Sequence, residues 1–343
     1  MLTDTIRELC LLSGVSSYED EVRAYVKEHA APYASELRVD PMGSVIVFKK
    51  GRRSTGNQLL LAAHMDEVGV IIRRITDEGY LKFACIGGID RRVLLGKKIL
   101  VGKNKTPGVI GLKAIHLTTA EEREKLPKLE EYYIDIGAKD KESAEKLTFI
   151  GDYGVFESDW VEFGSGMVKA KALDDRVGCA VMLELLKEDL PMDCTFAFTV
   201  QEEVGCRGAF GASFSVAPKI ALVLETTTAA DLAGMDGHKQ VCSPGKGPVV
   251  PFMDGSSVAD RGLFELMRDL AEKNDIPWQT KHFIAGGNDA ATIQRSREGV
   301  RTVVLSAAVR YLHAPASVAA LRDFDDILRL SRLFIAAVAQ QEE

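Results

Sequence analysis

The stretch Leu59-Leu60-Leu61-Ala62-Ala63-His64-Met65-Asp66 decides how this chain is expected to fold. Its apolar run over residues 58–63 is typical of a strand that is buried on both faces of a sheet. Similar apolar runs occur at 195–200, 220–224 and 302–305, and extended segments at 36–39 and 44–48. Helical patterns occur at 2–12, 19–30, 176–187, 262–273, 289–295 and 321–339. Buried strands that alternate with helices predict an α/β fold, a mixed sheet sandwiched between helices.

Residues 69–166 have a different character. They are rich in Gly and Lys, and short alternating segments occur at 71–75, 80–85, 97–101, 108–113 and 159–162, with one polar helix near 120–125. Short strands spaced by turns are typical of a small β-barrel or sandwich. We therefore expect a discontinuous catalytic α/β domain, 1–69 and 167–343, with an inserted β-barrel-like domain at 70–166.

Composition excludes several classes of protein. The 343 residues are 46% hydrophobic and 27% charged, as in an ordinary globular protein. The net charge of −7 and the absence of a Lys/Arg cluster argue against nucleic-acid or membrane partners. No long apolar run exists and the first residues carry many charges, so we expect a cytoplasmic protein. The six cysteines are widely spaced without a CxxC pair, which predicts reduced thiols.

Side chains that commonly bind metals stand near the ends of apolar runs. Two imidazoles and three carboxylates are the set that holds two divalent cations around one shared carboxylate, with a further carboxylate left as a base. In open α/β sheets such ligands gather at the carboxyl ends of the strands. The candidates are His64 with Asp66, Asp174, Glu202 with Glu203, Glu225, and His313.

Each candidate also has a structural interpretation when it is taken alone. His64 fits a hydrogen-bonded histidine at a strand end, and Asp174 fits a helix N-cap. The pair Glu202 and Glu203 fits a solvated acidic turn. The remaining histidines have no partner at a suitable spacing and are expected to be structural or exposed. These are His29, His116, His238 and His282.

Five motifs in this order resemble a known family, the tetrahedral, self-compartmentalising aminopeptidases, which include glutamyl, leucyl and deblocking enzymes and are relatives of the di-zinc exopeptidases. The segments 114–117 and 134–139 are similar to the inserted domain of that family. The motifs are Ala63-His64-Met65-Asp66-Glu67-Val68-Gly69, Leu173-Asp174-Asp175-Arg176-Val177-Gly178, Val200-Gln201-Glu202-Glu203-Val204-Gly205, Gly286-Gly287-Asn288-Asp289-Ala290 and Arg310-Tyr311-Leu312-His313.

The resemblance implies a role for each candidate. One cation would be held by His64 and Glu225 and the other by Glu203 and His313, with Asp174 as the bridge. Glu202 would be the general base and acid, Asp66 would orient His64, and Gly287, Asn288 and Asp289 would border the substrate pocket. Two departures are evident: Glu225 replaces the usual aspartate, and Ala307 and Ala314 stand where proline and serine are expected.

The resemblance also implies the chemistry. Two divalent cations bring +4 and three carboxylates −3, so one bridging hydroxide would make the cluster neutral and could attack a peptide carbonyl. Imidazole and carboxylate ligands suit zinc best, with cobalt or manganese as alternatives. The implied function is a metal-dependent aminopeptidase acting on peptides, with dimers that assemble into a dodecamer.

Other functions remain open from the residues alone. A carboxypeptidase would use an arginine for the terminal carboxylate, and Arg176, Arg207 and Arg310 lie near the motifs. Another metal-dependent amidohydrolase is also an alternative. A glycosidase such as an endoglucanase is a weaker alternative, because adjacent Glu202 and Glu203 cannot flank a glycosidic bond at a separation of about 5 Å or more. A metal-stabilised scaffold without catalysis would bind metal but hydrolyse no peptide.

Overall fold

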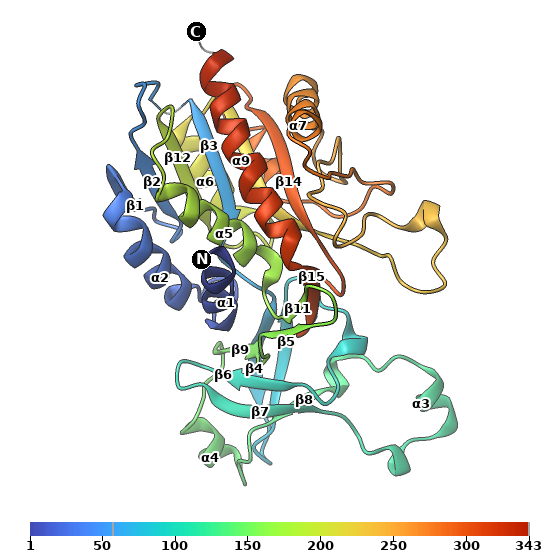
Figure 1. Ribbon diagram of the computed structural model, residues 1–343. Coiled ribbons are helices and arrows are strands. Elements are labelled where there is room, and N and C mark those ends of the chain that lie inside the picture. The colour runs from blue at the N-terminus through green and yellow to red at the C-terminus, as the bar shows by residue number, and fades with distance from the viewer. Residues whose placement is uncertain (57, 342–343) are drawn as a thin grey trace.

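The computed structural model describes residues 1–56 and 58–341 and has two parts, an α/β part and a β-barrel below it in Figure 1. The α/β part is built on a six-stranded sheet of order β1-β2-β12-β3-β13-β14. The last four strands in that order are parallel to one another, and β1 and β2 form an antiparallel edge. The predicted mixed sheet is thus confirmed. Its strands are β1 Glu36–Val39, β2 Val45–Lys49, β3 Leu59–His64, β12 Cys194–Thr199, β13 Ile220–Thr228 and β14 Arg301–Val309.

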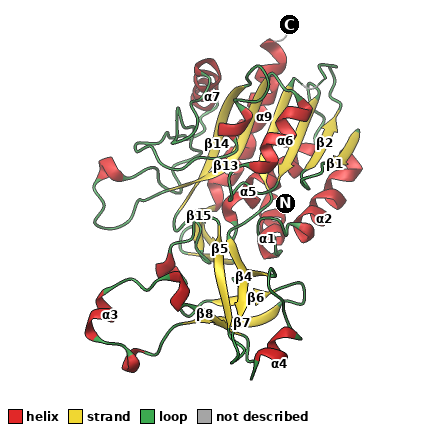
Figure 2. Ribbon diagram, turned by 180° about the vertical axis from the view of Figure 1, so that it is seen from behind, coloured by secondary structure: helices red, strands yellow, loops and turns green. Residues whose placement is uncertain are grey.

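Helices cover both faces of this sheet, as the two opposite views in Figures 1 and 2 show. Five helices contribute to the main core cluster on one face, and α6 with α8 packs in a smaller cluster on the other. The sheet is therefore the middle layer of a three-layer sandwich. The helices are α1 Leu2–Leu11, α2 Asp20–Ala30, α5 Leu173–Leu186, α7 Arg261–Lys273 and α9 Leu321–Gln341 on the first face, and α6 Arg207–Val216 and α8 Ala290–Ile293 on the second.

Strand β3 lies near the middle of the sheet because every one of its residues is apolar up to His64. All six residues are buried, between β12 on one side and β13 on the other. Helix α5 passes close over this strand at Gly178, where an added Cβ would lie 2.9 Å from the Cβ of Ala63. Glycine is therefore required for α5, and the acidic residues at its start, to approach the end of β3.

The second part is a closed barrel of six antiparallel strands in the order β4-β5-β8-β7-β6-β9, which confirms the predicted barrel. Its interior is a separate apolar cluster that includes Ile72, Phe83 and Ile134. A loop that carries α3 projects away from the barrel (Figures 1 and 2). The boundaries of an inserted domain at 70 and 166 stay a prediction. The elements are β4 Gly69–Ile75, β5 Leu81–Ile86, β6 Lys98–Val101, β7 Thr106–Gly111, α3 Ala120–Glu124, β8 Tyr133–Asp135, α4 Lys141–Glu145 and β9 Tyr153–Phe156.

A small three-stranded sheet lies between the two parts, and it corrects one prediction. The segment 159–162 was expected to be a barrel strand, but β10 (Val161–Phe163) pairs with β11 (Met167–Ala170), and β11 pairs with β15 (Ser317–Ala320). After β9 the chain has left the barrel and turns back toward the α/β part. Short 3-10 helices complete the list of elements, at Ala31–Tyr33, Arg91–Val93, Ile115–Leu117, Leu129–Glu131 and Gly237–Lys239.

All six cysteines are free, in agreement with the expectation of reduced thiols. Among the described residues, no helix combines the length and apolar character needed to cross a membrane.

Candidate active site

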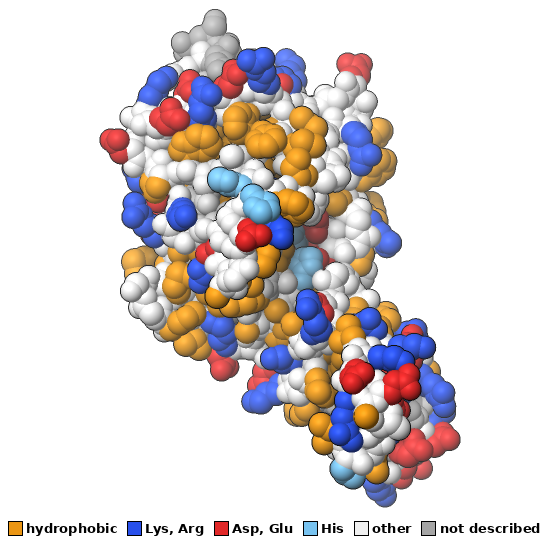
Figure 3. All heavy atoms as spheres, turned by 90° about the vertical axis from the view of Figure 1, so that its right-hand side faces the viewer, with side chains coloured by type: hydrophobic (Ala, Val, Ile, Leu, Met, Phe, Trp, Pro, Cys, Tyr) orange, Lys and Arg blue, Asp and Glu red, His pale blue; other side chains and the backbone are white. Residues whose placement is uncertain are grey.

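The predicted ligands converge where the parallel strands end and α5 begins. Figure 3 shows that the molecule is hollowed where its two parts meet, with histidine and acidic side chains visible in the hollow. His64 is the last residue of β3, and Asp174 lies in the first turn of α5. Glu202 and Glu203 follow β12, and His313 lies in the loop between β14 and β15. Strands distant in sequence thus deliver these side chains to one place, as expected for this fold class.

Glu225 does not follow its strand as predicted. Strand β13 continues to Thr228, because it pairs with β14 along its whole length, with Glu225 opposite Ser306. The carboxylate therefore projects from the interior of the sheet and is 4% exposed. It still reaches the cluster, since its Oε2 lies 3.9 Å from Nε2 of His64.

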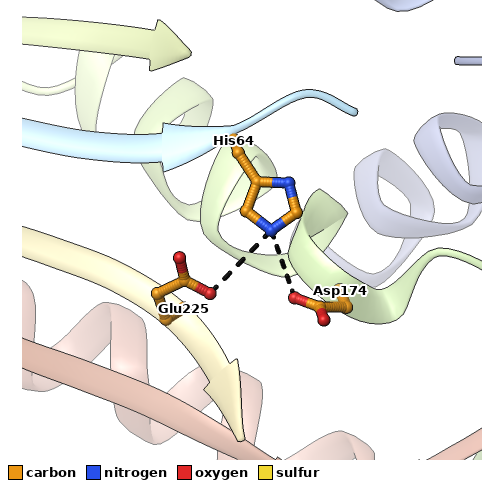
Figure 4. Close-up of side chains that lie close together, drawn as sticks. All are labelled: His64, Asp174 and Glu225. Carbon is orange, nitrogen blue, oxygen red and sulfur yellow. Dashed lines mark hydrogen bonds and ion pairs between the residues drawn. The ribbon is translucent and has the colours of Figure 1, made fainter. Parts of the chain in front are cut away.

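The His64 ring is fixed by a backbone hydrogen bond. Its Nδ1 donates to the carbonyl oxygen of Asp66 at 3.0 Å, which leaves Nε2 facing Asp174 Oδ1 at 3.3 Å and Glu225 (Figure 4). A ring that donates through one nitrogen offers the lone pair of the other to a cation. These three side chains place one ligand atom each within 4.8 Å of one another.

A second group shares Asp174 with the first. Oδ2 of Asp174 lies 3.3 Å from Nε2 of His313, which is also 3.3 Å from Oε2 of Glu203. The Nδ1 of His313 donates to the carbonyl of Gly88, in the loop that follows β5, at 3.1 Å. The barrel part therefore helps to orient a predicted ligand, through a contact that no sequence motif indicates.

Asp174 faces a different histidine with each carboxylate oxygen. The alternative role, capping α5, belongs to Asp175, whose Oδ1 accepts from the backbone N–H of Gly178 at 3.0 Å. Asp175 Oδ2 also accepts from the N–H of His64 at 3.3 Å, and the peptide bond between the two aspartates is cis. The structure thus gives the capping role to Asp175 and leaves Asp174 directed into the site.

Asp66 holds the loop that carries Glu202 and Glu203. It is fully buried, and its two oxygens accept from the backbone N–H groups of these residues at 2.9 and 3.2 Å. Ser16 Oγ donates to the same carboxylate at 2.7 Å. The Asp66 carboxylate lies 3.5 Å from His64 Nδ1, so it also faces the imidazole. Sequence reasoning missed Ser16, which no motif marks.

Three carboxylates of the site, those of Glu202, Glu203 and Glu225, are held in an environment that disfavours their charge. Burial also raises the pKa of Asp174, but hydrogen bonds from His313 and His64 outweigh it and hold that pKa below its ordinary value. Burial raises the pKa of Glu203 and of Glu225 well above the ordinary value, and the charge of Asp174 raises both further. Burial, with Asp289 and Asp174 nearby, likewise raises the pKa of Glu202 to about 7. Burial lowers the pKa of His313, but Asp174 and Glu203 more than offset this and raise it to about 9. A cluster of buried carboxylates is stable in its charged form when a cation compensates the charge.

The residues fit a pair of divalent cations. Glu225 Oε1 is buried and has no hydrogen-bond partner among the described residues, so it is free for coordination. Each group supplies one imidazole and two carboxylates, with Asp174 common to both, and zinc accepts imidazole nitrogens and carboxylate oxygens as ligands.

The three residues predicted to border the substrate pocket differ in their exposure to solvent. Gly287 is exposed. Asn288 is 8% exposed, donates to Asp254 at 3.3 Å and accepts from the N–H of Ala290. Asp289 is fully buried and accepts from Thr199 Oγ1 at 2.6 Å.

Comparison with known proteins agrees with this geometry. The chain is 36% identical over 329 residues to a putative aminopeptidase of Acetivibrio thermocellus, covering 95% of this chain and 96% of that one. It is similar in structure to aminopeptidase APDkam598 of Desulfurococcus kamchatkensis, with a TM-score of 0.92 and 35% identity over 97% and 94% of the two chains.

A third similar protein is a peptidase that forms large assemblies. The TET1 peptidase of Pyrococcus horikoshii, described as forming a tetrahedron or a large octahedral shell, matches with a TM-score of 0.86 and 31% identity, covering 98% of this chain and 99% of that chain. A family model, the M42 glutamyl aminopeptidases, matches residues 43–330. The chain therefore belongs to the M42 glutamyl aminopeptidase family and is a hydrolase of peptide bonds.

Proposed function

We propose that this aminopeptidase works with two divalent cations, one held by His64, Asp174 and Glu225 and the other by Asp174, Glu203 and His313. The observation that carries the proposal is the shared aspartate, which presents one oxygen to each histidine at 3.3 Å. When bound, such a pair of cations polarises the scissile carbonyl and lowers the pKa of the attacking water. Zinc suits the ligands best, and cobalt or manganese would also fit.

Glu202 is the group that moves the proton. It belongs to neither group of predicted ligands, and its Oε2 lies 4.0 Å from Nε2 of His64, at the edge of the cluster. It takes a proton from the attacking water and passes it to the leaving amine. Asp66 supports this role, because it fixes the backbone of Glu202 and sets the direction of the side chain.

The arginines that a carboxypeptidase would need are mostly engaged elsewhere. Arg176 is fully buried and donates to Met65, Leu9 and Glu67. Arg310 makes two hydrogen bonds of 2.7 Å to Asp231. Glu202 lies outside both proposed cation groups, so its carboxylate leaves the site better suited to a free amino terminus than to a terminal carboxylate.

The test pairs a matched variant with matched substrates. Glu202→Gln keeps the size of the side chain but cannot take the proton, so kcat should fall by about a hundredfold to ten-thousandfold while the two cations stay bound. Elemental analysis checks the cations, and a peptide with a free amino end should be hydrolysed where its N-acetylated form is not. Full turnover by the variant with its metal in place would disprove the role of Glu202.

The assembly proposed for this chain follows its relatives. We infer that residues 70–166 form the inserted domain and mediate dimers that assemble into a dodecamer in the cytoplasm, because a similar peptidase forms a tetrahedron. Light scattering with and without added cation tests this inference. A monomer with full activity would contradict it.

A further inference from the structure

Three side chains beside the proposed cation sites form a cluster that the proposed reaction does not use as a unit. They are Glu202, Cys206 and Asp289, and each offers one ligand atom within 4.8 Å of the other two. Cys206 stands at the N-terminus of α6, and its Sγ donates to Oε1 of Glu202 at 3.4 Å. The cluster contains the only thiol in any of the three candidate ligand groups of the described chain.

Asp289 supplies the observation that points to a ligand. Its side chain is fully buried, and Oδ2 accepts from Thr199 Oγ1 at 2.6 Å. Oδ1 is buried and has no hydrogen-bond partner among the described residues. Buried carboxylate oxygens almost always have a hydrogen-bond partner. Because Oδ1 has none, it is available to bind a cation.

The two oxygens of Glu202 face different neighbours. Oε2 lies toward His64 and the proposed catalytic cations, at 4.0 Å, whereas Oε1 lies toward Cys206. A cation bound on the Cys206 side would therefore hold the carboxylate without displacing any of the five predicted catalytic ligands. It could reach the thiol from outside, because Cys206, Gly205 and Thr292 line an open cavity of about 670 Å³.

We propose that Glu202, Cys206 and Asp289 form a third cation site that binds thiophilic divalent ions such as zinc and inhibits the enzyme. One sulfur and two carboxylate oxygens leave a fourth position for water in a tetrahedral zinc site. As the sulfur–metal bond forms, the thiol proton passes to the solvent. A thiolate ligand selects zinc over manganese or magnesium, which prefer oxygen.

Inhibition follows from the geometry and rests on the proposed role of Glu202. A carboxylate that coordinates a cation cannot take a proton from the attacking water. Excess zinc should therefore stop an enzyme whose catalytic positions are already filled, and excess manganese should not.

The experiment separates binding from catalysis. Cobalt(II) added to the manganese-loaded enzyme gives a thiolate-to-metal absorption band in the near ultraviolet only if it binds a cysteine, and neither catalytic group contains one. We expect this band and a third bound cation per subunit in the parent protein and in Cys85→Ser, which alters a thiol in the barrel. Both features should be lost in Cys206→Ser and in Cys206→Ala.

Zinc inhibition provides the second measurement. Each protein is compared with its own rate before zinc is added, and the zinc concentration that halves turnover should rise by on the order of 10- to 100-fold in the Cys206 variants. Either a cobalt band that survives in both Cys206 variants or inhibition that is unchanged by them would overturn the proposal. Absence of any peptide hydrolysis before zinc is added would instead refute the proposed function, while the cobalt band would still decide whether the site exists.

Discussion

Asp66→Asn should damage the site while changing its shape very little. The carboxylate accepts from the N–H of Glu202 on Oδ1 and from the N–H of Glu203 and Ser16 Oγ on Oδ2. Asparagine keeps one oxygen, so in either orientation its NH₂ group faces a backbone N–H that cannot accept. One buried donor thereby loses its partner, which costs about 1 to 3 kcal/mol, and the remaining bonds lose the assistance of charge.

The expected loss of unfolding free energy is about 3 kcal/mol, measured by urea unfolding with the metal chelated so that only the protein's own contacts are compared. Because the bonds position Glu202, kcat should fall more than KM changes. Asp325→Asn, the same change at an exposed position of α9, is the control and should shift stability by less than about 0.5 kcal/mol. Parent-like stability together with parent-like kcat in Asp66→Asn would refute the positioning role.

Three further outcomes are expected. Arg176→Met should lower the unfolding free energy, measured in urea, by about 3 kcal/mol, because it breaks the ion pair between a fully buried guanidinium and Glu67. Arg322→Met, at an exposed position, should not lower it by this amount. Burial raises the pKa of Glu19 to about 7, so this carboxyl holds its proton more tightly in the folded protein than in the unfolded one. Its contribution to the unfolding free energy should therefore decline by at most about 3 kcal/mol as pH rises from about 4.5 to 7. Glu19→Gln should remove this part of the pH dependence. Chelation should abolish hydrolysis and lower the melting temperature, and each cation restored at 100 times its Kd should return about 2.7 kcal/mol of stability; a melting temperature indifferent to cation would contradict the two sites.

The sheet and barrel could be predicted because local patterns determine them. The apolar run before His64 is buried on both sides in the structure, and runs of this kind have few alternatives to a central strand. Helix α6 was missed because residues 207–216 contain two glycines and two serines and have little intrinsic helical tendency. It forms through tertiary packing on the sheet, at Ala209, Ala212 and Val216.

The sequence indicated which side chains would lie close together at the candidate site, but not how they are connected. Residue type and order along the chain were enough to predict that the proposed ligands lie close together. The end of β13 was predicted too early, because pairing with β14 rather than local sequence extends the strand past Glu225. The contacts of Ser16 and Gly88 with the site join segments 50 and 225 residues apart in the chain, and neither residue belongs to a motif. Contacts of that kind depend on the packed structure.

The different tasks proposed for the two adjacent glutamates can be traced to Asp66. Because both backbone N–H groups bond to one carboxylate, the chain at Glu202 and Glu203 is held in a single arrangement. Successive side chains then diverge, so that Glu203 meets His313 at 3.3 Å while Glu202 lies between His64 and Cys206. If the proposed roles hold, a charge fixed beneath the loop separates cation binding from proton transfer, and the same fixed direction of Glu202 would expose it to capture by a thiophilic cation at Cys206.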